Sequence, residues 1–309
     1  MMNSTWKNIS LSRLMLGTVQ FGLPYGVANR TGQPDYRDVL KILTAAIEGG
    51  VNCFDTAAAY GNSEEILGRA LRELKVTDRV TVVTKFKPLT PEELADPALA
   101  KAALEASVES SRRRLQLDCL PLVLFHRETD AVHRPALEPL QESGKLRYVG
   151  VSCAHFPGPP HSYVESGLMS ALQLPANLLD RRHESSGIFR DAAAREVAVF
   201  IRSAFLQGLL VMPERDIPVE LQAVIPARRR LEQLSHDAGI DLAELALRYL
   251  LSQDAVTSVL IGVETVEQVE ENLARFERGP LPPDLFSAIQ AESFDLPELI
   301  VTPGMWSPR

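Results

Sequence analysis

Eight short apolar segments recur along the chain, and a helical pattern follows each of them. The segments are residues 14–18, 51–55, 80–85, 120–126, 148–152, 170–174, 197–203 and 258–262. They are apolar at both alternating positions, as strands are in a parallel sheet that helices cover on its faces. Eight such units, with no Ser/Gly-rich linker between them, favour a (β/α)8 TIM barrel over a doubly wound sheet of about six strands. We therefore predict a single α/β barrel domain over residues 1–309.

Apolar residues at helical spacing fill the connections between these strands. The predicted helices are residues 36–48, 63–74, 99–115, 135–143, 161–167, 188–194 and 265–276. The longer gap before the eighth strand contains two further helical patterns, 227–237 and 242–251, which predicts an extra helix there. At the N-terminus, residues 9–14 alternate like a short β-hairpin. A last helix, 284–292, and a Pro-rich tail are expected to lie across the barrel.

The composition excludes several classes of protein. The chain has 309 residues, is 45% hydrophobic and has a formal net charge of -8. This balance argues against a nucleic-acid binder, which needs clustered Lys and Arg. The arginine runs 112–114 and 228–230 fall within helical patterns, so we expect them on solvated helix faces.

Three cysteines without CxxC spacing, Cys53, Cys119 and Cys153, are typical of a reduced protein. The first residues lack the apolar core of a secretory signal, and no stretch approaches the ~18 apolar residues of a membrane span. We therefore expect a cytoplasmic protein that binds neither membrane nor nucleic acid. The histidines that do not end a strand share no metal-ligand spacing, and we predict no metal; they are residues 133, 155, 161, 183 and 236.

Polar side chains stand where the predicted strands end. They are Asp55, Tyr60, Lys85, His126, Ser152, Gln173 and Ser203. The carboxyl ends of barrel strands carry the active sites of barrel enzymes. Individually, an Asp after a strand is often a helix cap, and a Lys there often faces solvent. Since four titratable groups coincide at one rim, we interpret them as a functional site.

Short motifs in the same order along nearly the whole chain resemble the aldo-keto reductases. The motifs are residues 54–57 with 60–61, 63–68, 84–85, 124–126, 144–152, Gln173 with 177–181, 207–210, and 267–268 with 271–272. The resemblance implies a catalytic tetrad of Asp55, Tyr60, Lys85 and His126. Tyr60 would donate the proton as a carbonyl becomes an alkoxide. The Lys85 ammonium would favour phenolate, because the unperturbed pKa of tyrosine is about 10.

The other two tetrad residues have supporting roles in this interpretation. Asp55 would keep Lys85 charged and oriented, since a lysine buried without a carboxylate tends to lose its proton. His126 would donate a hydrogen bond to the carbonyl oxygen, which neutral imidazole can do.

The resemblance also implies a nicotinamide dinucleotide across the barrel mouth. Its carboxamide would contact Ser152 and Gln173, while Cys153 replaces the Asn usual in the family. Arg202 would stack on the nicotinamide, as a guanidinium plane can. The remaining expected contacts are Asp55, Gly17 and Thr18 at the inner rim and Ser203, Phe205 and Gln207 at the pyrophosphate.

At the adenosine end, the segment from Gly262 to Gln268 occupies the place where relatives bind the 2'-phosphate of NADP. Glu264 is unusual there, because a carboxylate repels a phosphate but can accept a hydrogen bond from a free ribose hydroxyl. Gln268, Glu271 and Asn272 match adenosine contacts of the family. The resemblance therefore implies NADP(H) by default, with NAD(H) possible because of Glu264.

The expected activity is NAD(P)(H)-dependent interconversion of an aldehyde or ketone with an alcohol. The polar loops 20–30, 127–134 and 213–223 suggest a hydroxylated or anionic substrate, including a sugar, but the sequence specifies neither substrate, direction, pathway nor oligomeric state. Two alternatives remain open. One is a Schiff-base aldolase that uses Lys85 as the nucleophile. The other is a cofactor-binding, redox-sensing subunit with little turnover.

Overall fold

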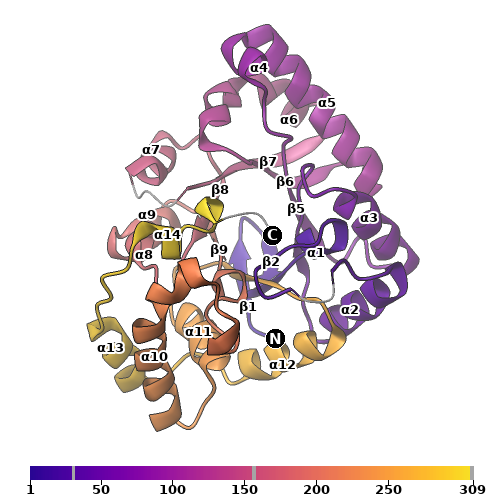
Figure 1. Ribbon diagram of the computed structural model, residues 1–309. Helices are drawn as coiled ribbons and strands as arrows, with labels where there is room; N and C mark the ends of the chain where they lie inside the picture. Colours follow the sequence, from indigo (N-terminus) through magenta and orange to yellow (C-terminus); the bar gives the residue numbers. More distant parts are fainter. Residues whose placement is uncertain (30–31, 155–157, 307–309) are drawn as a thin grey trace.

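The computed structural model describes residues 1–29, 32–154 and 158–306. Eight parallel strands close into a barrel in the order β10-β3-β4-β5-β6-β7-β8-β9, with helices around it (Figure 1). The barrel strands are β3 (Leu14–Gly17), β4 (Cys53–Asp55), β5 (Thr81–Lys85), β6 (Leu120–Phe125), β7 (Leu146–Ser152), β8 (Ala171–Pro175), β9 (Ala198–Arg202) and β10 (Ser258–Gly262). The predicted (β/α)8 barrel is confirmed.

Most predicted helices are confirmed within a few residues. The helices are α1 (Val19–Gly22), α2 (Tyr36–Glu48), α3 (Ser63–Glu73), α4 (Pro91–Ala95), α5 (Pro97–Leu115), α6 (Glu138–Glu142), α7 (Gly158–Ser166), α8 (Arg182–Ser185), α9 (Ile188–Ala194), α10 (Ile225–Asp237), α11 (Leu242–Leu251), α12 (Val266–Glu277), α13 (Pro283–Ala291) and α14 (Glu298–Val301). Helices α10 and α11 are the predicted addition before the last strand. The side chains of Asp35, Asp96 and Thr265 accept amide hydrogens at the starts of α2, α5 and α12, which fixes where these helices begin.

The predicted helix 135–143 is only partly correct. Residues Glu128–Leu137 form the 3-10 helix η1, and the α-helix begins at Glu138. Pro135 lies inside η1 and has no amide hydrogen to donate to an α-helical bond. Four shorter 3-10 helices follow later in the chain: η2 (Leu206–Gly208), η3 (Glu214–Asp216), η4 (Val219–Val224) and η5 (Pro303–Met305).

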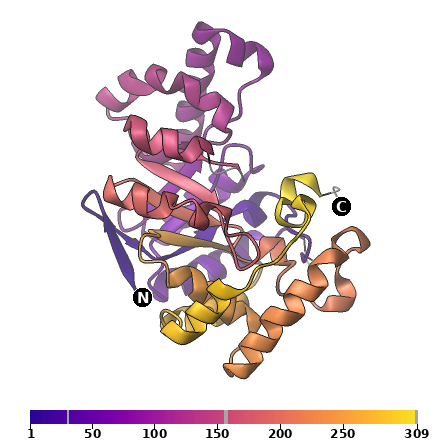
Figure 2. The same cartoon turned by 90° about the vertical axis from the view of Figure 1, so that its left-hand side faces the viewer.

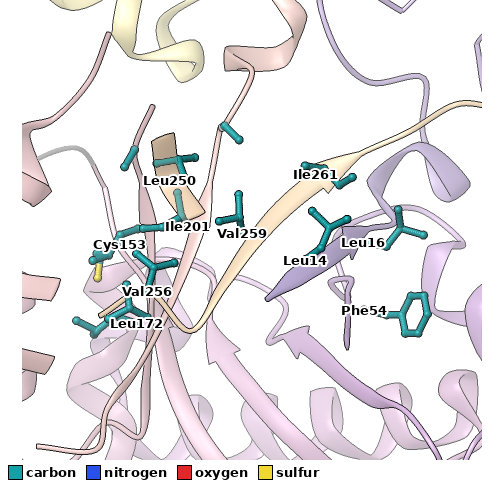
Figure 3. Close-up of a cluster of buried hydrophobic side chains, with 14 of the residues drawn as sticks. Leu14, Leu16, Phe54, Cys153, Leu172, Ile201, Leu250, Val256, Val259 and Ile261 are labelled. Atoms are coloured by element: carbon teal, nitrogen blue, oxygen red, sulfur yellow. The ribbon is translucent and has the colours of Figure 1, made fainter. Parts of the chain in front are cut away.

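Side chains on the strands alternate between two separate apolar layers. Outward-facing residues such as Leu14, Leu16 and Phe54 pack between the strands and the helices (Figure 3). Inward-facing residues such as Met15 and Cys53 belong to a second cluster that fills the barrel. Because this interior is filled with side chains, the barrel is a core and not a channel.

The predicted N-terminal hairpin is present, although it starts earlier than the sequence pattern indicated. It pairs β1 (Asn3–Trp6) with β2 (Ile9–Ser12). Trp6 is buried against the inner cluster, its Nε1 donates to the carbonyl oxygen of Glu196, and its ring lies 4.9 Å from that of Tyr148. In Figure 2 the hairpin is at one end of the barrel and the C-terminal tail is at the other. The hairpin therefore covers the end opposite the tail.

One prediction about the arginine runs is wrong. Arg228 is not on a solvated helix face but is buried. Its guanidinium donates to the carbonyl oxygen of Leu209 and to Glu232, so these tertiary partners take the place of water. Among the described residues, no helix combines the length and apolar character needed to cross a membrane.

Candidate active site

The alternation of the strands brings the predicted polar residues to one rim. Cys53 faces the barrel interior, so Asp55, two residues later on β4, points the same way. Val83 and Lys85 have the same relation on β5. It recurs in three further pairs: Leu124 and His126, Ala171 and Gln173, and Phe200 and Arg202. Each inward apolar position is therefore followed by an inward polar one at the strand's carboxyl end.

Asp55 and Lys85 form a buried ion pair. The Lys85 Nζ lies 2.7 Å from each carboxylate oxygen of Asp55, and it also donates to the Thr56 carbonyl oxygen at 2.9 Å. Both side chains are almost completely buried. Burial opposes the charged form of Lys85, but Asp55 and the Tyr60 phenol outweigh it, so the pKa of Lys85 is raised. The lysine is held as an ammonium ion.

Tyr60 lies beside this pair in a tight turn. The Lys85 Nζ is 4.9 Å from the centre of the Tyr60 ring, and the His126 ring meets that ring edge-on at 5.6 Å between centroids. The Tyr60 amide donates to the Ala57 carbonyl oxygen at 3.0 Å. Gly22 has no side chain, which lets the Tyr60 carbonyl approach it closely. The predicted tetrad therefore converges on one place.

His126 is uncharged at neutral pH. Burial lowers the pKa of His126 to about 3, and the positive charges of Lys85, Arg202 and Arg127 add to the effect. Its Nδ1 is buried and has no hydrogen-bond partner. A neutral imidazole beside Tyr60 can donate one hydrogen bond to a substrate oxygen.

Gln173 connects two parts of the site in a way that the sequence does not indicate. Its Nε2 donates to Asp55 Oδ1 at 2.7 Å, and Ser152 Oγ donates to its Oε1 at 3.4 Å. Ser152, Gln173, Asp55 and Lys85 thus form a continuous hydrogen-bonded chain across the barrel mouth. Gln173 orients the carboxylate that holds Lys85.

A cavity of about 580 Å³ begins at this site, within the usual range for small-molecule pockets. The predicted site residues that line it are Gly17, Asp55, Tyr60, Gln173, Arg202, Ser203, Phe205, Gln207, Gly262, Glu264, Gln268, Glu271 and Asn272. Four predicted site residues are not among its lining residues: Thr18, Lys85, His126 and Ser152. The Thr18 hydroxyl is instead bonded to the Asp55 carbonyl oxygen and to Ser63. Thr18 therefore stabilises the loop between β4 and α3 and does not line the cavity.

Asp241 and Arg275, which line the cavity, were absent from the sequence-based prediction of the site, and Gln20 and Asn29 were indicated only within the specificity loop 20–30. Tyr25, which the sequence indicated only within a specificity loop, also lines the cavity, and its hydroxyl accepts a bond from Gln207 Nε2 at 3.1 Å. The one signal in the sequence for Gln20 was its position, two residues after the end of the first predicted strand. Two residues named in the sequence analysis, Arg30 of loop 20–30 and His155, lie outside the described residues.

Hydrogen bonds and ion pairs connect the residues at the predicted adenosine end of the cavity. Gln268 Oε1 accepts the Glu264 amide hydrogen at 2.7 Å, and Thr265 Oγ1 accepts that of Gln268. Arg275 pairs with Asp241 and Glu271. A second, more open hollow of about 1480 Å³ lies under the C-terminal segment and contains none of the predicted site residues. Within the described ranges, no three His, Cys, Asp or Glu side chains are grouped as a metal site would require.

Comparisons with known proteins found similar sequences and similar structures. The sequence model of the Aldo/keto reductase family matches residues 13–293. The chain is 28% identical to L-glyceraldehyde 3-phosphate reductase of Escherichia coli (strain K12), over 85% of this chain and 84% of that protein. It is also 28% identical to NADH-specific methylglyoxal reductase of the same organism, over 86% of this chain and 90% of that protein.

A solved structure is similar over almost the full length. It is the holo form of aldo-keto reductase AKR11C1 from Bacillus halodurans, with a TM-score of 0.77 and 25% identity over 95% of this chain and 98% of that one. Glycerol dehydrogenase AKR11B4 from Gluconobacter oxydans has a TM-score of 0.72 and 26% identity, over 93% of this chain and 94% of that chain.

Proposed function

Because the chain belongs to the aldo/keto reductase family, we propose that it interconverts a carbonyl compound and an alcohol with a nicotinamide cofactor. The observation that carries the proposal is the convergence of Lys85 and His126 on Tyr60, which lines the cavity. The bound nicotinamide would supply or accept the hydride. The cavity suits such a ligand, since Asn272, which lines it, has a buried Oδ1 without a hydrogen-bond partner.

Each residue of the site has a separate role in the reduction of the carbonyl group. The neutral His126 donates a hydrogen bond that positions the carbonyl oxygen. Tyr60 passes its phenolic proton to that oxygen as negative charge develops there. The Lys85 ammonium stabilises the phenolate that results, and Asp55 keeps the ammonium in place. In the oxidative direction the same groups act in reverse.

The state of Lys85 argues against the aldolase alternative. A Schiff-base lysine must lose its proton to attack a carbonyl. Here the ion pair with Asp55 raises the pKa of Lys85 against its burial. We therefore expect borohydride to trap no carbonyl compound on Lys85, and a trapped adduct would contradict the reductase mechanism.

The decisive experiment replaces Tyr60 by Phe. The substitution removes the proton donor but keeps the ring, so we expect turnover to fall at least 10²-fold, because a positioned acid contributes about 10²–10⁴-fold. The dissociation constant for NADH or NADPH, followed by fluorescence, should change little. Unaltered turnover would exclude Tyr60 as the donor. Tight cofactor binding by the unmodified protein, without reduction of any aldehyde in a panel, would favour the redox-sensing alternative.

The cofactor choice depends on the adenosine end of the cavity. Three described arginines line the cavity. Arg202 is expected at the nicotinamide, and the other two are already paired, Arg228 with Glu232 and Arg275 with Asp241 and Glu271. No described cation therefore remains for a 2'-phosphate, and Glu264 adds negative charge. One relative is named as NADH-specific. We expect NADH to bind more tightly than NADPH in parallel fluorescence titrations; the reverse order would restore the NADP(H) default.

The substrate is proposed to be a small polar carbonyl compound. Tyr25, Gln207 and Arg202 supply polar groups to the cavity near Tyr60. The names of two relatives give methylglyoxal and L-glyceraldehyde 3-phosphate as substrates. A panel of short hydroxylated, phosphorylated and purely apolar aldehydes tests this, and preference for the apolar members would contradict it.

A further inference from the structure

Gln20 is a buried side chain whose hydrogen-bonding capacity is not met within the protein. It follows β3 in the short helix α1 and is only 7% exposed. Its Oε1 is buried without a hydrogen-bond partner, and the residue lines the cavity that begins at Tyr60. A buried acceptor without a donor costs free energy. Such an oxygen at a cavity wall indicates a donor on the ligand.

Gly262 makes room for this amide. The strand ends of β3 and β10 meet here, with Gly17 paired to Gly262 in the sheet register. A Cβ at position 262 would lie 2.5 Å from Gln20 Nε2 and 3.1 Å from Oε1. Any other residue would push the Gln20 side chain away. Gly262 and Gln20 therefore form one feature of the cavity wall.

Asn272, on a different helix, is a second buried residue of this cavity whose acceptor oxygen has no hydrogen-bond partner. This residue of α12 is 5% exposed, lines the same cavity and has an Oδ1 with no hydrogen-bond partner. Asn272 was expected at the adenosine end, whereas the sequence indicated Gln20 only as the first residue of the specificity loop 20–30 and gave it no cofactor contact. Two unmet buried acceptors in one cavity match a ligand that carries several donors, as the ribose units of a dinucleotide do.

We propose that Gln20 is a binding residue for the dinucleotide and that its Oε1 accepts a hydrogen bond from a ribose hydroxyl. The inference rests on the proposed function. A carbonyl oxygen repels phosphate oxygens and attracts hydroxyl groups, which selects the ribose and not the pyrophosphate. Gly262 holds the acceptor in position by leaving it space.

The test compares Gln20→Met with Gln20→Glu in equilibrium titrations with NADH. Methionine keeps the length and removes the acceptor, so we expect the dissociation constant to rise about five- to tenfold, as for one lost neutral hydrogen bond. Glutamate keeps an acceptor oxygen, and its dissociation constant should stay closer to that of the unmodified protein than the Met variant's. A Glu variant that binds more weakly than the Met variant would indicate a phosphate partner and overturn the assignment.

Further experiments distinguish a failure of the Gln20 assignment from a failure of the proposed function. Gly262→Ala should weaken NADH binding as Gln20→Met does, whereas the control Gln233→Met, an exposed position outside the cavity lining, should leave it unchanged. ADP-ribose, titrated by calorimetry, should show the same loss with Gln20→Met; a loss confined to NADH would overturn the ribose assignment. If the unmodified protein binds neither NADH nor NADPH, the proposed function fails. If it binds them and Gln20→Met changes nothing, only the role of Gln20 fails.

Discussion

Lys85 and His126 are both largely buried at one site, yet they have opposite charge states. Lys85 has the Asp55 carboxylate at 2.7 Å and remains an ammonium ion. His126 faces the cations Lys85, Arg202 and Arg127, and after burial these lower its pKa to about 3. Burial disfavours charge at both residues, and only the lysine has an anion to offset it. One site thus presents a fixed positive charge and a neutral donor.

The depressed pKa of His126 predicts an acid-dependent loss of stability. Between the ordinary histidine pKa of about 6.5 and the folded value of about 3, the unfolded chain binds a proton that the folded protein does not. Stability should therefore fall as pH drops through this window and be unaffected by His126 above it. We expect urea midpoints to decline less between pH 7 and pH 4.5 in His126→Asn than in the unmodified protein. Parallel declines would contradict a neutral, buried His126.

The sequence identified the tetrad because its residue types and strand-end positions are local features. It did not identify the bond from Gln173 to Asp55, since the two residues are 118 positions apart and either could have bonded elsewhere. Gln20 was missed for a related reason. An isolated glutamine gives no pattern, and its unmet oxygen becomes visible only when Gly262 is placed beside it.

Among the elements, the strands were easier to predict than the turns between them. Strand positions follow from apolar runs, and the helices α2, α9 and α11 have the predicted bounds. The 3-10 helix η1 and the burial of Arg228 were not predicted, because they depend on a proline-interrupted turn and on the distant Leu209 carbonyl. Periodicity reports which face of a helix is apolar, but not what long-range partner a polar residue finds.

The close packing of β7 against β8 predicts an effect of Gly150→Ala. A methyl group there would run into the Ala171 carbonyl and lie 2.7 Å from Leu124 Cδ2. Overpacking of this kind costs about 1–3 kcal/mol, which urea unfolding at pH 7 would measure. The matched control is Gly304→Ala, where a Cβ meets nothing within 4 Å. Equal stability of the two variants would show that β7 and β8 can separate at little cost.

On the scale of the whole molecule, the hairpin and the candidate active site lie at opposite ends of the barrel. Trp6 fills the covered end with 5% of its surface exposed. We expect Trp6→Ala to lower the free energy of unfolding by about 3–5 kcal/mol, as large core truncations do, with one transition if residues 1–309 are one domain. Val219→Ala, at an 81% exposed position, is the control. The NADH dissociation constant of folded Trp6→Ala should be unchanged; a marked rise would show that the two ends are coupled.

The barrel interior is filled by side chains and the hairpin covers one end of it, and this has a kinetic consequence for the proposed reaction. Because side chains fill the barrel interior and Trp6 is buried at the hairpin end, we expect ligands to reach Tyr60 through the cavity that it lines. A ligand that binds first and lies deeper in the cavity can dissociate only after the ligand that binds second has dissociated. We expect the dinucleotide to bind first, so that the alcohol product dissociates before the dinucleotide does.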